Sequence, residues 1–229
     1  LWENFRSIQE KLIALKTFKS VNIQGVEYHN AGGSISQELA FTLAQLSEYF
    51  ANSPSLEPNK IQISLGVSTN YFFEIAKFRA IRILWTQMLN AFKKDNIPLY
   101  LRAETGIRTS TIFDPYVNML RTTSQCMSAA LGGANIINTS NFNAAFKKND
   151  DFAQRMARNI SLILKEESYF NKVSDPSSGS YYIENLTNEL SLNAWTLFQE
   201  IEANGGWLKA VQSNFIQDSI EKNAAKQQQ

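Results

Sequence analysis

Two carboxylates are the first candidates for chemistry in this chain. Glu27 and Glu104 each follow a short β-rich run, so each is expected at the C-terminal end of a strand. Where parallel strands alternate with helices, active sites are built at that edge of the sheet. Two carboxylates that converge there could act as general acid and base, or as a hydrolase pair. The competing interpretation, which we favour, leaves each carboxylate in solvent or paired with Arg102 or Arg108.

The chain has one histidine, His29, and one cysteine, Cys126. A single histidine in the loop after a strand is more often a surface or structural residue than a catalytic one, and we expect the same here. With no carboxylate pair at facing spacing beside them, these residues predict no metal site. One thiol cannot form an intrachain disulfide, which favours a reducing compartment and leads us to expect a cytoplasmic protein.

The charge and apolar patterns exclude several classes of partner. The 22 basic and 21 acidic side chains are interspersed and give a net charge of +1, so neither nucleic acid nor an anionic membrane surface is expected. No apolar run approaches the roughly 20 residues that a membrane span needs. Gly-rich phosphate loops and dinucleotide turns are also absent from the sequence.

Hydrophobic periodicity predicts a leading helix and then four strand–helix units. The leading helix is expected over residues 2–18, and the strands over 20–26, 61–67, 98–103 and 135–139. Ser34 or Ser36 is expected to cap the helix after the first strand. The apolar faces predicted for the four helices are Leu39, Leu43, Leu46 and Phe50; Phe72, Ala76, Ala80 and Ile83; Val117, Leu120, Met127 and Leu131; and Phe152, Met156, Ile160 and Ile163.

Consecutive strand–helix units indicate a parallel sheet with right-handed crossovers, either doubly wound or part of a (β/α)8 barrel. The four units occupy about residues 20–170, whereas a closed barrel takes roughly 250, so this chain alone cannot complete one. The exposed edges need cover from an N-terminal portion, a partner or the terminal helices. Because Leu1 is not methionine, we expect that the natural protein begins further upstream.

After about residue 168 the pattern changes. A loop over 171–180 is followed by two predicted helices, 184–203 and 207–224. Gly205 and Gly206 separate them and suit the left-handed conformation that ends a helix. The glutamine tail, 227–229, is expected to fray or to begin a linker.

Several stretches resemble the substrate-barrel domain of the methylmalonyl-CoA mutase family, and they occur in the right order. The similarity runs from Phe18 to about Ala225 and is carried by residues 38–44, 70–80, 114–118, 157–159 and 175–182. Residues 70–80 read Asn-Tyr-Phe-Phe-Glu-Ile-Ala-Lys-Phe-Arg-Ala, and 175–182 read Asp-Pro-Ser-Ser-Gly-Ser-Tyr-Tyr. The resemblance implies that residues 1–170 are the C-terminal half of a TIM-type barrel with a leading helix. Residues 171–229 would be a helical extension leading toward a linker.

The departures from the family pattern fall at its chemistry. Catalytic members bind the substrate thioester carbonyl through a histidine, and the matching residue here is Glu27. A carboxylate cannot donate that hydrogen bond, and its charge opposes an acyl-CoA that carries its own carboxylate. We therefore expect no catalytic residue in this chain. The vestigial substrate-site positions implied by the resemblance are Glu27, Lys60, Gln62, Arg102, Glu104 and Asn138, where Glu104 and Asn138 also stand in place of histidines.

These departures imply the non-catalytic small (beta) subunit of a heterodimer. Its partner would be a large catalytic subunit that binds adenosylcobalamin and interconverts methylmalonyl-CoA and succinyl-CoA in propionate metabolism. No cofactor is expected in this chain, since the cobalamin motif Asp-x-His-x-x-Gly is absent. Two alternatives remain open: a diverged barrel enzyme that uses Glu27 and Glu104 as acid and base, and a coenzyme A ester-binding scaffold without chemistry.

Overall fold

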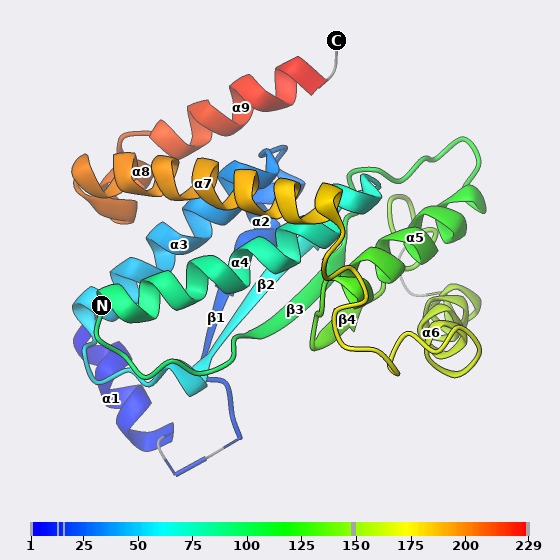
Figure 1. Ribbon diagram of the computed structural model, residues 1–229. Coiled ribbons are helices and arrows are strands. Elements are labelled where there is room, and N and C mark those ends of the chain that lie inside the picture. The colour runs from blue at the N-terminus through cyan, green and yellow to red at the C-terminus, as the bar shows by residue number, and fades with distance from the viewer. Residues whose placement is uncertain (1, 13, 16, 148–149, 228–229) are drawn as a thin grey trace.

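The computed structural model describes residues 2–12, 14–15, 17–147 and 150–227, and is built around a parallel sheet (Figure 1). Its strands pair in the order β1-β2-β3-β4. Helices α3, α4 and α5 connect successive strands, and α6 follows the last. The strands are β1 (Val21–Gln24), β2 (Ile61–Val67), β3 (Tyr100–Thr105) and β4 (Ile136–Asn138), and the helices are α3 (Ile35–Asn52), α4 (Tyr71–Ala91), α5 (Val117–Leu131) and α6 (Asp151–Glu166). The predicted α/β class, a partial β/α barrel with C-terminal helices, is confirmed.

The remaining elements lie before, between and after these units. They are α1 (Trp2–Leu12), α2 (Gly25–Asn30), a 3-10 turn (Pro58–Lys60), α7 (Tyr181–Ala203), α8 (Gly206–Gln212) and α9 (Phe215–Gln227). Figure 1 shows α7 lying alongside α3 and α4, with α8 and α9 continuing from it. Of the predicted glutamine tail, Gln227 ends α9, while Gln228 and Gln229 lie outside the described residues, as does Leu1.

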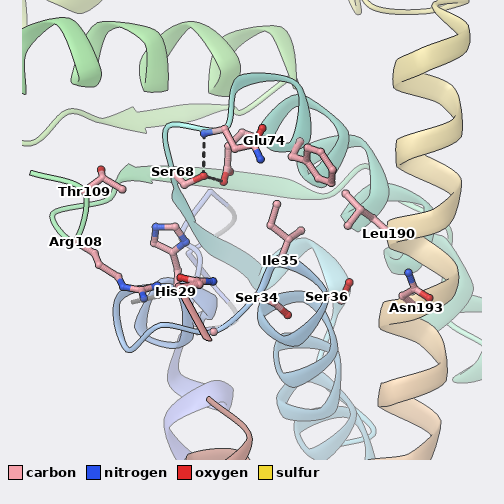
Figure 2. Close-up of a pocket in the computed structure, with 14 residues that line it drawn as sticks. His29, Ser34, Ile35, Ser36, Ser68, Glu74, Arg108, Thr109, Leu190 and Asn193 are labelled. Atoms are coloured by element: carbon pink, nitrogen blue, oxygen red, sulfur yellow. Dashed lines mark hydrogen bonds between the residues drawn. The ribbon is translucent and has the colours of Figure 1, made fainter. Parts of the chain in front are cut away.

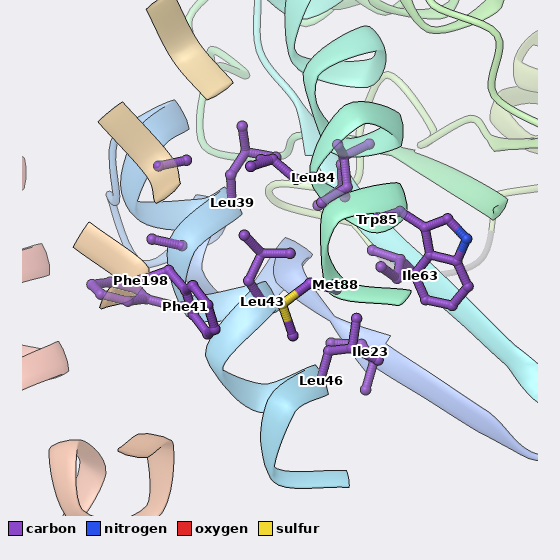
Figure 3. Packing of buried hydrophobic residues seen from close by; sticks show 14 of the residues in the cluster. Ile23, Leu39, Phe41, Leu43, Leu46, Ile63, Leu84, Trp85, Met88 and Phe198 are labelled. Carbon is purple, nitrogen blue, oxygen red and sulfur yellow. The ribbon is translucent and has the colours of Figure 1, made fainter. Parts of the chain in front are cut away.

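Strand alternation separates an apolar face of the sheet from a polar one. Ile23, Ile63 and Leu101 are paired across β1, β2 and β3 and are fully buried. Against them pack side chains of α3 and α4, the helices that cover this face (Figure 3). The opposite face carries Gln62, Ser64, Arg102 and Glu104. The sheet therefore packs its core on one side only.

The terminal helices belong to the same core. Leu190, Ala194 and Phe198 of α7 are buried against the cluster formed by the sheet, α3 and α4. In addition, the Trp207 indole of α8 donates a hydrogen bond of 2.8 Å to the Tyr28 hydroxyl of α2. The division of the chain at residue 170 stays a prediction, but residues beyond it complete the hydrophobic core.

Several predicted boundaries were wrong for local reasons. The leading helix ends at Leu12 instead of residue 18, and β1 ends at Gln24 because Gly25 begins the short helix α2. A Cβ on Gly25 would lie 2.6 Å from the Thr42 hydroxyl oxygen, so only glycine fits where the chain turns from β1 into α2. The last predicted helix is two helices, α8 and α9, separated at Asn214, whose φ is +61°.

Three predicted apolar helix faces were also wrong in part. In α6, Phe152 and Ile163 are 44% and 48% exposed, and the buried residues are Ala153, Ala157 and Leu164. Phe72 and Ile83 of α4 are 51% and 40% exposed, while Ala76 and Ala80 are buried as expected. In α5, Leu120 is 72% exposed and Asn118 is buried instead. The Asn118 amide donates to the backbone oxygens of Thr111 and Phe142, both at 2.8 Å. The inner face of α5 is therefore polar because it holds two loops in place.

The predicted cap of α3 is confirmed at Ser34. Its hydroxyl accepts from the Gln37 N–H at 3.2 Å, and the Gln37 side chain accepts from the Ser34 N–H at 2.8 Å. Ser34→Ala should lower the free energy of unfolding by about 1 kcal/mol, because one helix N–H loses its acceptor. Urea denaturation measures this. Ser36→Ala, which removes a hydroxyl outside the cap, is the control, and an equal loss in both variants would contradict the assignment.

Candidate functional site

The main cavity, of about 670 Å³, opens at the carboxyl ends of β1, β2 and β3. Each strand is followed by residues that line it: His29 after β1, Ser68 after β2, and Arg108 after β3. The start of α3 and the α7 residues Leu190 and Asn193 complete the wall (Figure 2). Parallel strands bring the segments after their carboxyl ends to one edge, which explains why residues so distant in sequence meet here.

His29 is buried in this wall, and its position corrects the prediction of a loop histidine. It lies in α2, is 7% exposed, and packs its ring against Gly66 and Gly106. A Cβ on Gly66 would lie 2.4 Å from the ring, so glycine is required there. Burial lowers the pKa of His29 to about 4, and the nearby charge of Lys77 acts in the same direction. The imidazole is therefore neutral at physiological pH.

Behind His29 lies a buried cluster of charged groups. The Lys77 ammonium contacts Glu38 Oε2 at 2.9 Å and Glu74 Oε2 at 2.6 Å. It also donates to the Gly66 carbonyl oxygen at 2.6 Å, while Glu38 Oε1 accepts from the Gly66 N–H at 2.7 Å. No side chain of this ion-paired trio is more than 1% exposed. The cluster thus binds the end of β2 to α3 and α4.

Two carboxylates, Glu38 and Glu74, share one ammonium in this cluster. Their surroundings shift the pKa values of Glu38 and Lys77. Burial raises the pKa of Glu38 to about 7; Lys77 lowers it and Glu74 raises it further. Burial alone would lower the pKa of Lys77, but Glu38 and Glu74 together raise it. Lys77 is therefore charged at neutral pH, and Glu38 holds a proton over part of the physiological range.

The two carboxylates proposed as an acid and base do not share the cavity. Glu27 lies on α2, beyond the end of β1, and is exposed, whereas the prediction placed it at the strand end. Glu104 lies on β3 as predicted, with Oε1 at 3.2 Å from Arg102 Nε. Neither side chain lines the cavity of about 670 Å³. The geometry matches the competing interpretation, in which one carboxylate is solvated and the other is paired with an arginine.

The other predicted substrate positions are brought together only in part. Glu104 and Asn138 are register partners on β3 and β4. Lys60 and Gln62 lie at the opposite, amino end of β2, where the Lys60 ammonium donates to the Leu15 carbonyl oxygen at 2.7 Å. Gln62 donates to the Asn22 side chain at 3.3 Å. These residues are spread along the sheet and do not form one pocket.

Sequence reasoning missed the buried cluster, although its members were in view. Glu74 and Lys77 belong to the stretch 70–80, where charged residues three apart interrupt an apolar run. Glu38 likewise stands at the start of the apolar run Leu39-Ala40-Phe41. Charged residues on the buried face of an amphipathic helix were the available signal.

Another ion-pair junction joins two of the stretches that carry the family resemblance. Arg79 of α4 pairs with Asp175 in the loop before α7 and, at 2.6 Å, with Glu184 of α7. Glu184 also accepts from the Gly179 N–H at 3.1 Å. Asp175 has a φ of +47°, a left-handed conformation that the arginine contact holds. Residues 70–80 and 175–182 are therefore parts of one structural junction.

The described part of the chain offers no group of three or more His, Cys, Asp or Glu side chains that could hold a metal ion. None of its helices is long and apolar enough to cross a membrane. Cys126 is buried, and burial raises the pKa of its thiol to about 11, so the thiol stays protonated.

Lys77→Met should destabilise the protein strongly. Removing the ammonium leaves Glu38 and Glu74 facing each other without a counter-charge, and breaking a buried ion pair costs about 3–5 kcal/mol. Chemical denaturation monitored by circular dichroism measures the loss. Lys165→Met is the control, because Lys165 and its partner Glu166 are both more than half exposed, and should change stability little. Equal effects in both variants would contradict the role given to Lys77.

The pH dependence of stability should reveal the opposite shifts of His29 and Glu38. The lowered pKa of His29 contributes stability that is present above about pH 6.5 and is lost as the pH falls through about 4. The raised pKa of Glu38 contributes stability that is present below about pH 4.5 and is lost as the pH rises through about 7. Between these limits the two contributions offset each other, as folding in effect moves one proton from histidine to glutamate.

His29→Gln should expose the glutamate contribution alone. The difference in unfolding free energy between wild type and variant should grow by on the order of 3 kcal/mol from about pH 4 to 6.5. Urea denaturation at a series of pH values measures it, with Glu27→Gln on the exposed side of α2 as control. A difference that does not vary with pH would show that His29 keeps its ordinary pKa.

Comparison with known proteins agrees with this architecture. A profile of the family described as methylmalonyl-CoA mutase matches residues 9–229. The chain is 39% identical to the methylmalonyl-CoA mutase small subunit of Porphyromonas gingivalis over 225 residues, which is 94% of this chain and 36% of that protein. It is 36% identical to the large subunit of the same organism over 222 residues, 92% of this chain and 31% of the relative.

A methylmalonyl-CoA mutase of Rhizobium meliloti is 40% identical over 221 residues, 92% of this chain and 31% of its own length. The chain thus spans about a third of the length of the curated relatives it matches. Percentage identity alone does not separate small from large subunits. The coverage and the identity together establish the family, and this chain belongs to the methylmalonyl-CoA mutase family.

Proposed function

We propose that this chain is part of a non-catalytic small subunit of a methylmalonyl-CoA mutase heterodimer. In this proposal a large partner subunit isomerises methylmalonyl-CoA and succinyl-CoA. Residues 1–170 contribute half of a TIM-type barrel, and residues 171–229 form the helical extension packed on it. The complex is placed in the cytoplasm, where the single thiol of Cys126 stays reduced.

The observation that carries the proposal is the loss of hydrogen-bond donors for a thioester oxygen. The positions that the resemblance assigns to substrate-binding histidines hold Glu27, Glu104 and Asn138. Glu27 is exposed on α2, and Glu104 is paired with Arg102. The one histidine in the chain, His29, is neutral and buried in the cavity wall, with its ring against Gly66 and Gly106. An oxyanion-type site needs preorganised donors. The two carboxylates supply none, and Asn138, whose amide can donate, is exposed on β4 and does not line the cavity.

The same residues do not fit the cofactor of the family. A histidine that binds the cobalt of adenosylcobalamin must bring a ring nitrogen to the ligand, and Nε2 of His29, although it has no hydrogen-bond partner, is buried against Gly106. We therefore assign the cofactor to the partner subunit, and no step of the reaction is assigned to this chain.

The two named subunits of Porphyromonas gingivalis support a partner of the same family. The sheet also favours further structure beside it, since β1 and β4 are its edge strands and an edge strand presents unpaired backbone groups. In the loop before α5 and on α5 itself, Phe113 is 96% exposed and Leu120 is 72% exposed. Such apolar side chains are typical of a surface that is covered in an assembly.

Activity of the separated and combined subunits tests the proposal. Assayed by itself, the full gene product should not turn over methylmalonyl-CoA. It should copurify with the large subunit, and the complex of the two should be active. A coupled assay with adenosylcobalamin measures this. Glu27→Gln and Glu104→Gln, introduced together, should leave kcat of the complex unchanged, since neither residue is given a catalytic role. Turnover by the small subunit alone, or a large loss with these substitutions, would contradict the proposal. No observation favours Glu27 and Glu104 as an acid–base pair.

A further inference from the structure

The main cavity at the strand ends is distinct from the positions that the resemblance assigns to the substrate site. None of those six positions is among its described lining residues. Its volume of about 670 Å³ falls within the roughly 300–1,000 Å³ that is typical of small-molecule sites. A ligand in this cavity is therefore selected by a different set of side chains.

Arg108 is the charged group that this cavity offers to a ligand. No hydrogen bond or ion pair in the described part of the chain engages its guanidinium. The guanidinium lies close to the turn at Gly32, where a Cβ would come within 3.3 Å of Arg108 Cζ. The one carboxylate among the described lining residues, Glu74, is already bound by Lys77 at 2.6 Å. The cavity therefore favours an anion, and the guanidinium fork suits a carboxylate or a phosphate.

Hydroxyl and amide side chains line other parts of the cavity. They are Ser36 at the start of α3, Asn70 before α4 and Asn193 on α7. Within the residues that the structure describes, no hydrogen bond engages any of these three side chains. Figure 2 shows Ser36 and Asn193 on the side of the cavity away from Arg108. Because hydroxyl and amide groups both donate and accept, they suit a ligand that carries hydroxyl groups.

The wall between these groups is already fixed by internal contacts. The Ser68 hydroxyl donates to Glu74 Oε1 at 2.6 Å and accepts from the Asn70 N–H at 3.2 Å. Phe73 and Leu190 add an apolar surface to the same wall. A site whose wall is ordered before binding loses less affinity to the cost of ordering.

We propose that the main cavity binds a small organic anion that carries hydroxyl groups. The acid group pairs with Arg108, and the hydroxyl groups bond to Ser36 and Asn193. The carbon chain lies against Phe73 and Leu190. Either a carboxylate or a phosphate ester satisfies this chemistry. The inference goes beyond the proposed function and does not depend on whether the chain belongs to a heterodimer.

Isothermal titration calorimetry of the full gene product tests the site. Gluconate and glucose 6-phosphate are the hydroxylated anions, and the one that binds more tightly identifies the acid group. Glucose lacks the charge, and inorganic phosphate lacks the hydroxyl groups. Each of these two should therefore bind at least about tenfold more weakly than the better anion.

Substitutions locate the binding in this cavity. Arg108→Gln should weaken binding of the better anion about tenfold or more, because a charged hydrogen bond is lost, and Asn193→Ala should weaken it about threefold or more. Both side chains are exposed, so neither change is expected to unfold the protein. Arg155→Gln, which changes an exposed arginine of α6 outside the cavity, is the control and should bind as wild type.

Three results would overturn the proposal. The first is that neither anion binds with a Kd below about 10 mM. The second is that glucose or inorganic phosphate binds as tightly as the better anion. The third is that Arg108→Gln or Asn193→Ala binds like wild type, or that Arg155→Gln loses as much affinity as Arg108→Gln.

Discussion

The arrangement of the sheet and its covering helices depends on a lysine that has no contact with water. The Lys77 side chain is fully buried, and burying an ammonium without partners would be highly unfavourable. Glu38, Glu74 and the Gly66 carbonyl oxygen surround it, so its three donors are satisfied by α3, α4 and β2. Each partner comes from a different part of the chain, and the cluster therefore fixes how these elements meet. The cavity at the strand ends takes its shape from that meeting.

The stretches that identify the family are structural ones. Glu74 and Lys77 occupy the buried cluster, and Arg79 joins α4 to Asp175 and Glu184 beyond the last strand. The positions that the resemblance gives to substrate-binding histidines lie elsewhere, on the exposed side of α2 and on the polar face of the sheet. A fold and the site placed upon it can thus change independently. The interactions that hold the scaffold and the positions that the resemblance gives to the substrate site therefore lie in different parts of the molecule.

The pattern of the sequence predicted the order of the elements better than their contacts. Runs rich in isoleucine, leucine and valine located all four strands, and Ser34 was recognisable as a cap. The short helix α2 was missed because its six residues are too few to show a helical period. As a result, Glu27 was placed at a strand end. The buried side of α5 was misjudged because periodicity assumes that buried faces are apolar, whereas Asn118 is buried to hold two loops.

The buried cluster could not be assembled from sequence, because Glu38 and Lys77 are 39 residues apart and only the parallel sheet brings their helices together. This has an evolutionary consequence. A lineage that lost Lys77 alone would retain two unneutralised carboxyl groups, and one that lost Glu38 would free the Gly66 amide. Substitutions in the cluster must therefore arrive together, while the solvent-facing side of α2 can drift one residue at a time. Few single substitutions are therefore tolerated beside β2, and many more on the exposed side of α2.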